Sequence, residues 1–540
     1  MQTCNGVGAG LKPALALLAL LCFAPTTPAQ NLGTQLNKVG QTFFYLQNYY
    51  LDTINMDKLV ERVVARTIAE LDPHSAYIPA KDVQAMNEPL EGNFEGIGIE
   101  FSIIMDTLVV IAPVAGGPSE AVGISAADRI VAVNDSVIAG VGLTNERVYS
   151  FLRGAKGTKV RITVIRKGVK DPLTFEITRD KIPINSLDAA YEALPDIAYV
   201  RLTRFALTSM TEFIDAISNS FVRMPKGVIL DLRGNPGGYM EPALLITEQF
   251  LEKGKLMVYT EGTHMPRLEE SASGKGFFID TPVVVLIDEG SASASEILAG
   301  ALQDWDRGII IGRRSFGKGL VQHGLPLSDG SQIRLTVARY HTPSGRVIQT
   351  PYNQGDQEGY YRNVVDRYLR GEQFSKDSIH LLDSLSYKTL VNKRTVYGGG
   401  GIMPDIFVPH DTTGYTAYWA QMIRMGIVTE FMNQYIDQER HLLSKKYTQF
   451  NVFNRDYSVP DEVIEELVAF AQTKDLPRNE EALQVSLPII RVQLKALVAR
   501  TLFDSNAYVQ IINEWNDPAY NKALEVISHW NKFEQEILRK

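Results

Sequence analysis

The residues best suited to chemistry lie near the middle of the chain, where an apolar run leads into three closely spaced serines. Residues 282–287 are almost entirely aliphatic, and Ser291, Ser293 and Ser295 follow within a few positions. A buried strand that turns sharply into a helix can hold a hydroxyl beside the unpaired backbone N–H groups of the helix start. A serine in that setting could act as a nucleophile if a base lies within reach.

Ser293 also has a purely structural interpretation. Ser293 and Glu296 have the spacing of a capping box, in which each side chain accepts a backbone N–H at the start of a helix. Short motifs of this kind also arise by chance. The two interpretations are compatible, because a nucleophile at a helix start gains backbone donors that can hold an oxyanion.

Lys318 is the candidate base, and it lies between two glycines. A lysine amine has a pKa of ~10.4, so a base near neutral pH must lose roughly 3 units, or about 4 kcal/mol. Gln322 could accept a hydrogen bond from the amine and orient it. The alternatives are a surface lysine and an ordinary polar strand residue. The apolar neighbours that could desolvate the amine are Phe316, Leu320 and Val321.

A glycine-rich segment, residues 231–238, follows one predicted strand and opens a helix. Its glycines allow backbone N–H groups to approach a substrate closely, and its spacing matches neither common phosphate-binding pattern. The eight histidines are scattered and no HExxH motif occurs, so we expect no metal or organic cofactor. His323 alone could replace Lys318 as the base, and we expect it on the opposite face of its strand.

The N-terminus resembles a secretory signal. Lys12 precedes an apolar run at residues 14–24, and small residues place a cleavage site near Ala29. Cys4 and Cys22 both lie in this segment, so the mature chain would have no cysteine and no disulfide. We therefore expect an exported protein, periplasmic or secreted. The net charge of −8 argues against broad nucleic-acid binding.

The chain of 540 residues is too long for one core. Short strands with glycine turns, among them residues 108–111, 129–133 and 159–165, indicate a compact β-rich module. Strands then alternate with helices, which is typical of a layered α/β core, and the end of the chain is helical. Residues 353–362 are the best linker candidate. The predicted parts are a signal peptide (1–29), an N-terminal helical region (30–88), the β-rich module (89–180), the α/β core (181–411) and a C-terminal helical extension (412–540).

Several motifs, in their order along the chain, resemble the carboxyl-terminal processing proteases, or tail-specific proteases, of peptidase family S41. The resemblance implies a multidomain fold of the α+β and α/β classes, with a layered αβ serine-peptidase core (like ClpP and crotonase) and an inserted PDZ domain. It places the nucleophile at Ser293, the base at Lys318 and the supporting amide at Gln322. The oxyanion hole would be the N–H of Ala294 with that of Gly237 or Gly238. The matching motifs are residues 71–75, 96–99, 231–238, 290–296, 316–319 and 398–405.

The resemblance also assigns roles within the β-rich module. In a PDZ domain a chain end adds to the sheet as a strand, and its carboxylate lies in a nest of backbone N–H groups. That loop corresponds to Gly96, Ile97, Gly98 and Ile99, which without the resemblance would form an ordinary hairpin turn. Arg153 matches a PDZ arginine that relays substrate binding in some relatives, and a solvated loop residue is its alternative.

The predicted function is a serine endopeptidase with a Ser–Lys dyad that cleaves exported proteins near their C-termini. Its partners would be protein or peptide tails, and the C-terminal helices could also bind an adaptor or form a homodimer. An amphipathic helix more often packs within its own chain. Two alternatives remain open: a non-catalytic protein that only binds tails, and a non-peptidase hydrolase or an enzyme like enoyl-CoA hydratase, since the core layers are similar.

Overall fold

The computed structural model describes residues 32–221, 223–381 and 383–539. The predicted signal peptide lies outside these residues. The chain divides into two compact units, one ending at Thr67 and one beginning at Ile68. The first unit contains helix α2 (Leu32–Tyr49) and most of α3 (Met56–Ala69), and no side chain of α2 is buried. These are the two helices expected in the N-terminal region.

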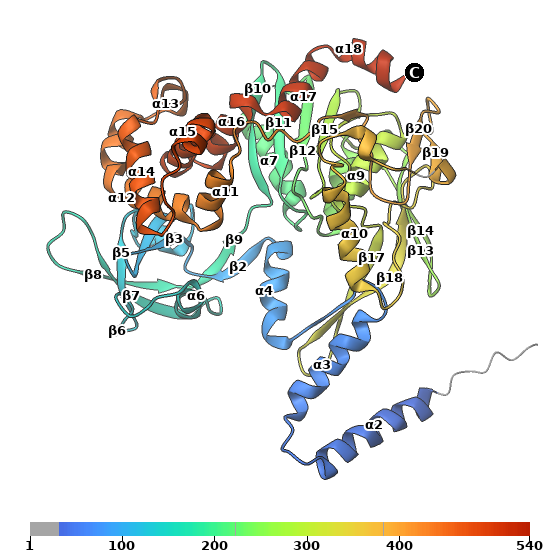
Figure 1. The fold of residues 1–540 in the computed structure, drawn as a ribbon, viewed down its shortest axis with the longest axis horizontal. Coiled ribbons are helices and arrows are strands. Elements are labelled where there is room, and N and C mark those ends of the chain that lie inside the picture. Colours follow the sequence, from blue (N-terminus) through green and yellow to red (C-terminus); the bar gives the residue numbers. More distant parts are fainter. Residues whose placement is uncertain (1–31, 222, 382, 540) are drawn as a thin grey trace, which may run out of the picture. The chain divides into compact units, whose positions relative to one another are not determined.

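A six-stranded sheet forms the centre of the second unit (Figure 1). The first two strands are antiparallel, and all later pairs are parallel. Its middle strands are buried along their whole length, as expected when both faces of a parallel sheet are covered. In spatial order the strands are β10 (Leu187–Leu194), β11 (Ile197–Leu202), β12 (Gly227–Asp231), β15 (Val283–Ile287), β16 (Ile309–Gly312) and β21 (Ile406–Phe407).

Helices cover both faces of this sheet. Alternate residues of β12 and β15 enter two different cores, because successive side chains of a strand point to opposite faces. One face packs on α7 (Ser209–Ser220), α8 (Met240–Glu248) and α9 (Ala294–Asp304). The other packs on α17 (Pro518–Ser528), α18 (Trp530–Phe533) and η3 (Glu534–Leu538), so the end of the chain supplies one layer of the central core.

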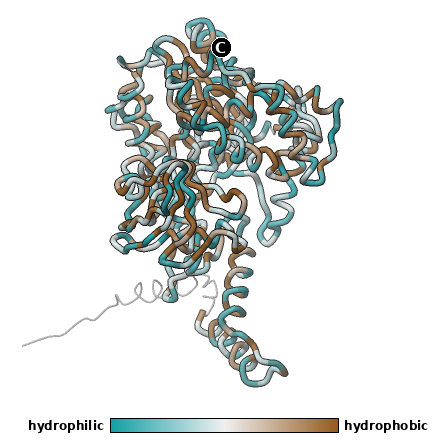
Figure 2. The backbone as a smooth tube through the Cα atoms, turned by 90° about the vertical axis from the view of Figure 1, so that its left-hand side faces the viewer, coloured by the Kyte–Doolittle hydropathy of each residue, from teal (hydrophilic) through white to brown (hydrophobic). Residues whose placement is uncertain are grey.

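A second sheet lies against this core and carries several residues of the site. Its strands are β1 (Ala76–Ile78), β18 (Gln332–His341), β13 (Leu256–Gly262) and β14 (Met265–Ser271), with β17 (Leu320–Pro326) paired to β18. In Figure 2 hydrophobic stretches run through the body of the second unit, broken by hydrophilic segments. The connecting elements are α4 (Ala80–Glu91), α10 (Gln357–Leu369), η1 (Lys376–Ser378), η2 (Asp383–Leu385), β19 (Ser386–Lys388) and β20 (Thr395–Tyr397).

The β-rich module forms a sheet with its own hydrophobic core, as predicted. The expected strands at 129–133 and 159–165 match β5 and β7, and residues 108–111 lie within β4. Strand β3 is at one edge of the sheet. The elements are β2 (Asn93–Gly96), β3 (Ile99–Ile104), β4 (Thr107–Pro113), α5 (Pro118–Ala121), β5 (Arg129–Val133), β6 (Ser136–Val137), α6 (Asn145–Leu152), β7 (Lys159–Ile165), β8 (Leu173–Thr178) and β9 (Asp180–Pro183).

The C-terminal helices pack into a separate core, which is the intramolecular arrangement weighed for them above. This helical module also contacts the β-rich module: the Asn433 amide donates to Ser102 Oγ (2.7 Å), and Arg129 pairs with Asp437 (2.5 Å). Its helices are α11 (Ala417–Arg424), α12 (Ile427–Lys446), α13 (Phe450–Asp456), α14 (Asp461–Thr473), α15 (Glu480–Leu502) and α16 (Ser505–Asn516).

The expected linker at residues 353–362 is wrong in part. Helix α10 begins at Gln357 within it, because the carboxylate of Asp356 accepts the N–H of Gly359 and caps the helix. The polar composition of the segment comes from the exposed side of this helix.

Candidate active site

Ser293 lies at a strained turn between β15 and α9. Its backbone has φ +55° and ψ −112°, and α9 begins with the next residue, Ala294. A non-glycine residue in a left-handed conformation of this kind costs roughly 1–3 kcal/mol and is typical of functional sites. Ser293 and Glu296 form the predicted capping box, in which the Glu296 carboxylate accepts the N–H of Ser293. The same turn places Ser293 in the lining of the pocket.

Two backbone N–H groups beside Ser293 have no partner among the described residues: those of Ala294 and Gly238. Ala294 is the first residue of α9, where an N–H has no intrahelical acceptor. The N–H of Gly237 is already donated to Asn235 Oδ1 (2.9 Å). Between the two glycines that the sequence left open, Gly238 is thus the one with a free donor.

Both glycines occur where no other residue fits. A Cβ on Gly237 would lie 2.9 Å from Ser293 Cβ and 3.0 Å from Ala294 N, so this glycine lies directly against the nucleophile turn. A Cβ on Gly238 would lie 2.1 Å from Phe205 O, and its φ is +150°. The glycine-rich loop is therefore positioned as expected, with its backbone close to Ser293.

Lys318 lies in the same pocket as Ser293, with its amine oriented by Gln322. The amine donates to Gln322 Oε1 (3.0 Å), and the Gln322 amide donates to the carbonyl of His74. Burial, and then the positive charge of Arg334, lower the pKa of Lys318 below its usual value. Lys318 and Gln322 thus come from the loop before β17 and from β17 itself, and Ser293, at the start of α9, lines the same pocket.

Glu296 connects the loops that carry Ser293 and Lys318. Its two carboxylate oxygens accept the N–H groups of Ser293 (2.8 Å), Gly317 (2.8 Å) and Lys318 (2.9 Å), and the hydroxyl of Ser315 (2.5 Å). Burial raises the pKa of this carboxyl to about 7, although these hydrogen bonds oppose the shift. The sequence suggested Glu296 only as a capping partner, and its role is wider.

Tyr340 provides a second connection between the two catalytic segments. Its buried hydroxyl lies 3.0 Å from the carbonyl oxygen of Ser293 and 2.7 Å from that of Lys318. No local motif around Tyr340 marks this role in the sequence, because both partners are backbone atoms from distant segments.

The histidines near the site do not replace Lys318. Burial, and then the charge of Lys318, lower the pKa of His74 to about 4, so its ring is a weak proton acceptor. Its Nε2 lies 3.1 Å from the hydroxyl of Tyr360. His323 is exposed and does not line the pocket, in agreement with the expectation that it points away.

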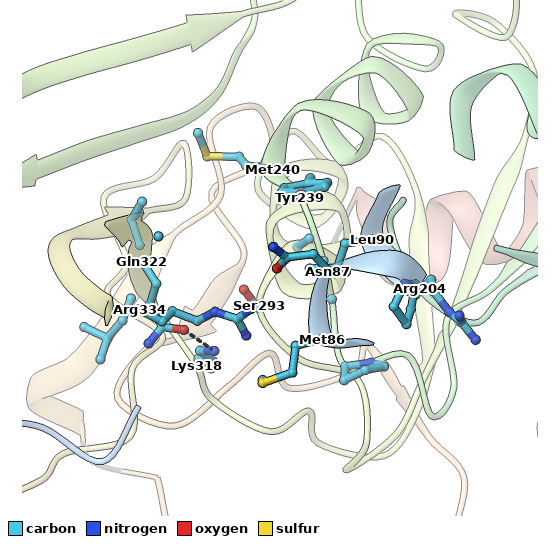
Figure 3. Close-up of a pocket in the computed structure, with 18 of the residues that line it drawn as sticks. Met86, Asn87, Leu90, Arg204, Tyr239, Met240, Ser293, Lys318, Gln322 and Arg334 are labelled. Atoms are coloured by element: carbon cyan, nitrogen blue, oxygen red, sulfur yellow. Dashed lines mark hydrogen bonds between the residues drawn. The ribbon is translucent and has the colours of Figure 1, made fainter. Parts of the chain in front are cut away.

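Ser293 and Lys318 open into a pocket of about 890 Å³ (Figure 3). Helix α4 supplies one wall, through Met86, Asn87 and Leu90. Arg334 lies on the β18 side, near Gln322. The pocket is large enough for several residues of an extended peptide. Its apolar side chains include Met86, Leu90, Met240, Ile297, Leu320 and Val321.

Arg153 lies at the junction between the β-rich module and the wall of this pocket. Its guanidinium pairs with Glu88 on α4 (2.5 Å) and lies over the rings of Phe94 and Tyr149, at 4.9 and 4.8 Å from their centroids. Its Nε is buried with no partner among the described residues. Arg153 therefore packs at this junction, although it lies in the loop after α6 and 37% of its side chain remains exposed.

The predicted carboxylate loop, Gly96 to Ile99, leads directly into the edge strand β3. Ile97 is buried and Gly98 has φ +73°, as a tight backbone turn requires. The ring of Phe101 on β3 contacts Tyr149 on α6 at 5.8 Å between centroids. These residues lie outside the pocket that contains Ser293.

Three known families match parts of the chain. Peptidase family S41 matches residues 196–358, the PDZ domain matches 96–178, and a family of unknown function (DUF8443) matches 418–504. The last match falls within the helical module.

Curated relatives match over longer stretches. A carboxy-terminal-processing protease of Bartonella bacilliformis is 37% identical over 346 residues, covering 63% of this chain and 79% of the relative. The carboxy-terminal processing protease CtpA of Bacillus subtilis is 32% identical over 372 residues, covering 66% and 78%. Among solved structures, the photosystem II D1 C-terminal processing protease is 31% identical, with a TM-score of 0.33 and coverage of 58% and 83%.

The family match spans the segments that carry Ser293 and Lys318, and the PDZ match spans the β-rich module. The two relatives align over 346 and 372 residues at 37% and 32% identity, and each alignment is longer than either family match. The chain therefore belongs to the carboxy-terminal processing proteases of peptidase family S41, a family of serine peptidases, and carries a PDZ domain.

Proposed function

We propose that this enzyme is a serine endopeptidase with a Ser293–Lys318 dyad that cleaves exported proteins near their C-termini. The observation that carries the proposal is the strained Ser293 turn, which faces a pocket shared with a lysine of lowered pKa. Lysine in its neutral form has a free electron pair, so it accepts the proton of Ser293 as the oxygen attacks the peptide carbonyl. The protonated amine then donates that proton to the leaving nitrogen.

Backbone donors stabilise the charge that develops on the carbonyl oxygen. The N–H groups of Ala294 and Gly238 are the two free donors beside Ser293, and removing one such donor typically slows a reaction 10²–10³-fold. Loss of the amine product leaves an acyl-enzyme on Ser293 Oγ. Water then attacks the ester with Lys318 as the base, and the free serine is restored.

The PDZ domain captures the substrate tail in this proposal. The free edge of β3 accepts the tail as an added strand, and the turn at Gly96–Ile99 holds its carboxylate. Arg153 supports a link from this groove to the catalytic pocket. It stacks on Tyr149 of α6 and pairs with Glu88 of α4, the helix that forms the pocket wall.

Export and further partners are also part of the proposal. The signal-like N-terminus supports a periplasmic or secreted location. Large apolar residues remain exposed on the helical module, among them Leu442 and Val485, and could serve an adaptor or a second copy of the chain.

The experiment is cleavage of an unfolded protein with an apolar C-terminus, followed by mass spectrometry of the products. Ser293→Ala and Lys318→Ala should each reduce turnover by roughly 10³-fold or more while the protein stays folded. His323→Ala, which alters a nearby residue outside the pocket, should keep normal turnover. Normal cleavage by either dyad variant would refute the assignment, and an uncut substrate with the intact enzyme would favour the binding-only alternative.

A further inference from the structure

A second cavity lies at the carboxyl ends of the parallel strands, and no known role accounts for it. It measures about 610 Å³, within the usual range for a small-molecule site. In open α/β sheets, ligands commonly bind outside the carboxyl ends of the strands. We call it the strand-end cavity. Its core-side lining consists of Arg201, Arg233, Gly234, Asp288 and Arg313, and residues 408–411 complete this side.

The core side of the strand-end cavity contains one arginine, Arg201, that makes no direct ion pair among the described residues, although Asp231 and Asp188 stabilise its charge from a distance. Arg233 pairs with Asp231 and Asp517, both at 2.6 Å, and Arg313 pairs with Glu289 at 2.7 Å. Arg201 makes no ion pair or hydrogen bond with any described residue, and its Nε is buried. The other guanidinium nitrogens of Arg201 are not buried in this way, so they are the donors that a ligand in the cavity can reach.

The neighbouring carboxylate, that of Asp231, makes its hydrogen bonds with other residues. Asp231 lies beside Arg201 in the register of β11 and β12. Both of its oxygens already accept hydrogen bonds, from Arg233 and from the hydroxyl of Tyr199. Burial disfavours the charge of Arg201, but Asp231 and Asp188 outweigh it and raise the pKa of this group. Arg201 therefore stays charged and keeps guanidinium N–H groups free to donate to an anion that enters the strand-end cavity.

The opposite wall of the strand-end cavity comes from the helical module and its connections, and it is mainly apolar, with Asn513, Asn516 and Asp517 at its polar end. A ligand held there would need an apolar part as well as an anionic group. The residues that form this wall are Tyr415, Val485, Pro488, Ile489, Ile512 and Trp515.

Three loops border both this cavity and the catalytic pocket. The loop after β12 contributes Arg233 to the strand-end cavity and Gly238 to the catalytic pocket. The loop after β15 contributes Asp288 to the strand-end cavity and Ser293 to the catalytic pocket. The loop after β16 contributes Arg313 to the strand-end cavity and Lys318 to the catalytic pocket.

Hydrogen bonds also connect the three loops to one another. The N–H of Gly234 donates to Asp288 (2.8 Å), and the N–H of Phe316 donates to the carbonyl of Ser291 (3.0 Å). The N–H of Ala292 donates to the carbonyl of Asn235 (3.0 Å). A displacement at the strand-end cavity therefore has a continuous route to the catalytic residues.

We propose that the strand-end cavity is a regulatory site for a small organic carboxylate with an apolar substituent, which pairs with Arg201 and acts on the catalytic residues through the three shared loops. The carboxylate accepts from the Arg201 guanidinium, and the substituent packs on Trp515 and Tyr415. The two states differ in the position of the loops, which binding shifts. The site does not depend on the PDZ domain or on the identity of the protein substrate.

Calorimetric titration with 4-phenylbutyrate and its neutral amide, 4-phenylbutyramide, tests the binding. The acid should bind the intact protein at least about tenfold more tightly than the amide, and Arg201→Met should remove this preference. Arg201→Lys should retain part of it. Trp515→Ala, which changes a half-exposed wall residue, should weaken acid and amide alike and provides a second variant if Arg201→Met does not fold.

Two control variants locate the binding. Arg362→Met alters an exposed arginine that does not line the cavity and should bind normally. Arg334→Met alters a cation of the catalytic pocket and should also bind normally. Loss of binding in Arg334→Met with retention in Arg201→Met would place the ligand in the catalytic pocket and overturn the proposal. Equal binding of acid and amide would also overturn it.

The regulatory step is tested by the rate at which a fluorophosphonate labels Ser293. Saturating 4-phenylbutyrate should change this rate at least about threefold in the intact protein and leave it unchanged in Arg201→Met. Binding without any change in labelling would overturn the regulatory role. An acetylated tripeptide that ends in phenylalanine, used as the free acid and as the amide, tests whether the natural ligand is a peptide C-terminus or a free small acid. The ligand class is the one whose carboxylate form binds in a way that depends on Arg201.

Discussion

The chemistry of the site depends on how individual charges surround Lys318. Its amine is half enclosed, hydrogen-bonded to Gln322 and close to the positive charge of Arg334. Both burial and this charge disfavour the protonated amine, whereas Glu296 and Asp72 favour it. The balance lies toward a lowered pKa, which a lysine base requires.

Removal of the Arg334 charge should make the enzyme require a higher pH. In Arg334→Gln the protonated amine of Lys318 is no longer repelled, so its pKa rises and the neutral base forms only at higher pH. In a plot of kcat/KM against pH for a short peptide, the acidic limb should shift to higher pH. Arg339→Gln, on an exposed position of the same strand, should leave the limb in place. An unmoved or downward-shifted limb in Arg334→Gln would show that Arg334 does not influence the base.

Some of these residues could be predicted from the sequence and others could not. Ser293, Lys318 and Gln322 lie in short local motifs, and the structure brings them into one pocket. Arg334 and Tyr340 stand in an ordinary strand, with no neighbour in the sequence that marks them. Their importance comes from contacts with segments far away in the chain, which a local pattern does not contain.

At the scale of elements, the glycine-rich loop after β12 shapes the proposed oxyanion site. Its positive φ angles and its contact with Phe205 follow from glycines at fixed positions. The sequence identified this loop but could not choose the donor between Gly237 and Gly238. The choice depends on a hydrogen bond from Gly237 to the side chain of Asn235, which is a matter of side-chain orientation.

Gly238→Ala should damage catalysis more than stability. A methyl group there would meet Phe205 O at 2.1 Å, so the loop must shift and the oxyanion donor moves with it. We expect kcat to fall roughly 10²–10³-fold. Gly234→Ala is the matched control: its φ is +70°, but a Cβ meets no atom within 4 Å, so it should mainly lower Tm. A normal kcat for Gly238→Ala would exclude it as the donor.

One element boundary shows where a local pattern is insufficient. Helix α15 begins at Glu480 and contains Pro488, so the helix extends well before the proline. Proline is common in the first turn of a helix, so a local pattern favours a start beside Pro488. The preceding turns are held by packing in the helical module, and Asn479 caps the true start.

At the scale of the whole molecule, the end of the chain is part of the central core. Helix α17 packs on β12, β15 and β16, and the residues it covers are fully buried. The order of motifs predicted the layered core and the PDZ domain. The sequence could not reveal that the sheet's second face is covered by residues more than 200 positions further along.

Val526→Asp tests this contribution to stability. Val526 is fully buried on α17, and a carboxylate there would lose its hydration with no partner. We expect Tm to fall by at least about 5 °C in thermal denaturation. Asn521→Asp adds the same charge at an exposed position of α17 and should leave Tm nearly unchanged. Equal Tm values for the two variants would mean that α17 is dispensable.

The left-handed backbone at Ser293 has a consequence for which residues this position tolerates. Glycine adopts this conformation without the cost that a serine bears, so replacement of the nucleophile by glycine relaxes the turn while it abolishes the chemistry. The turn therefore tolerates a change of Ser293 to glycine, which removes the proposed nucleophile, so folding alone gives no reason for a serine at this position.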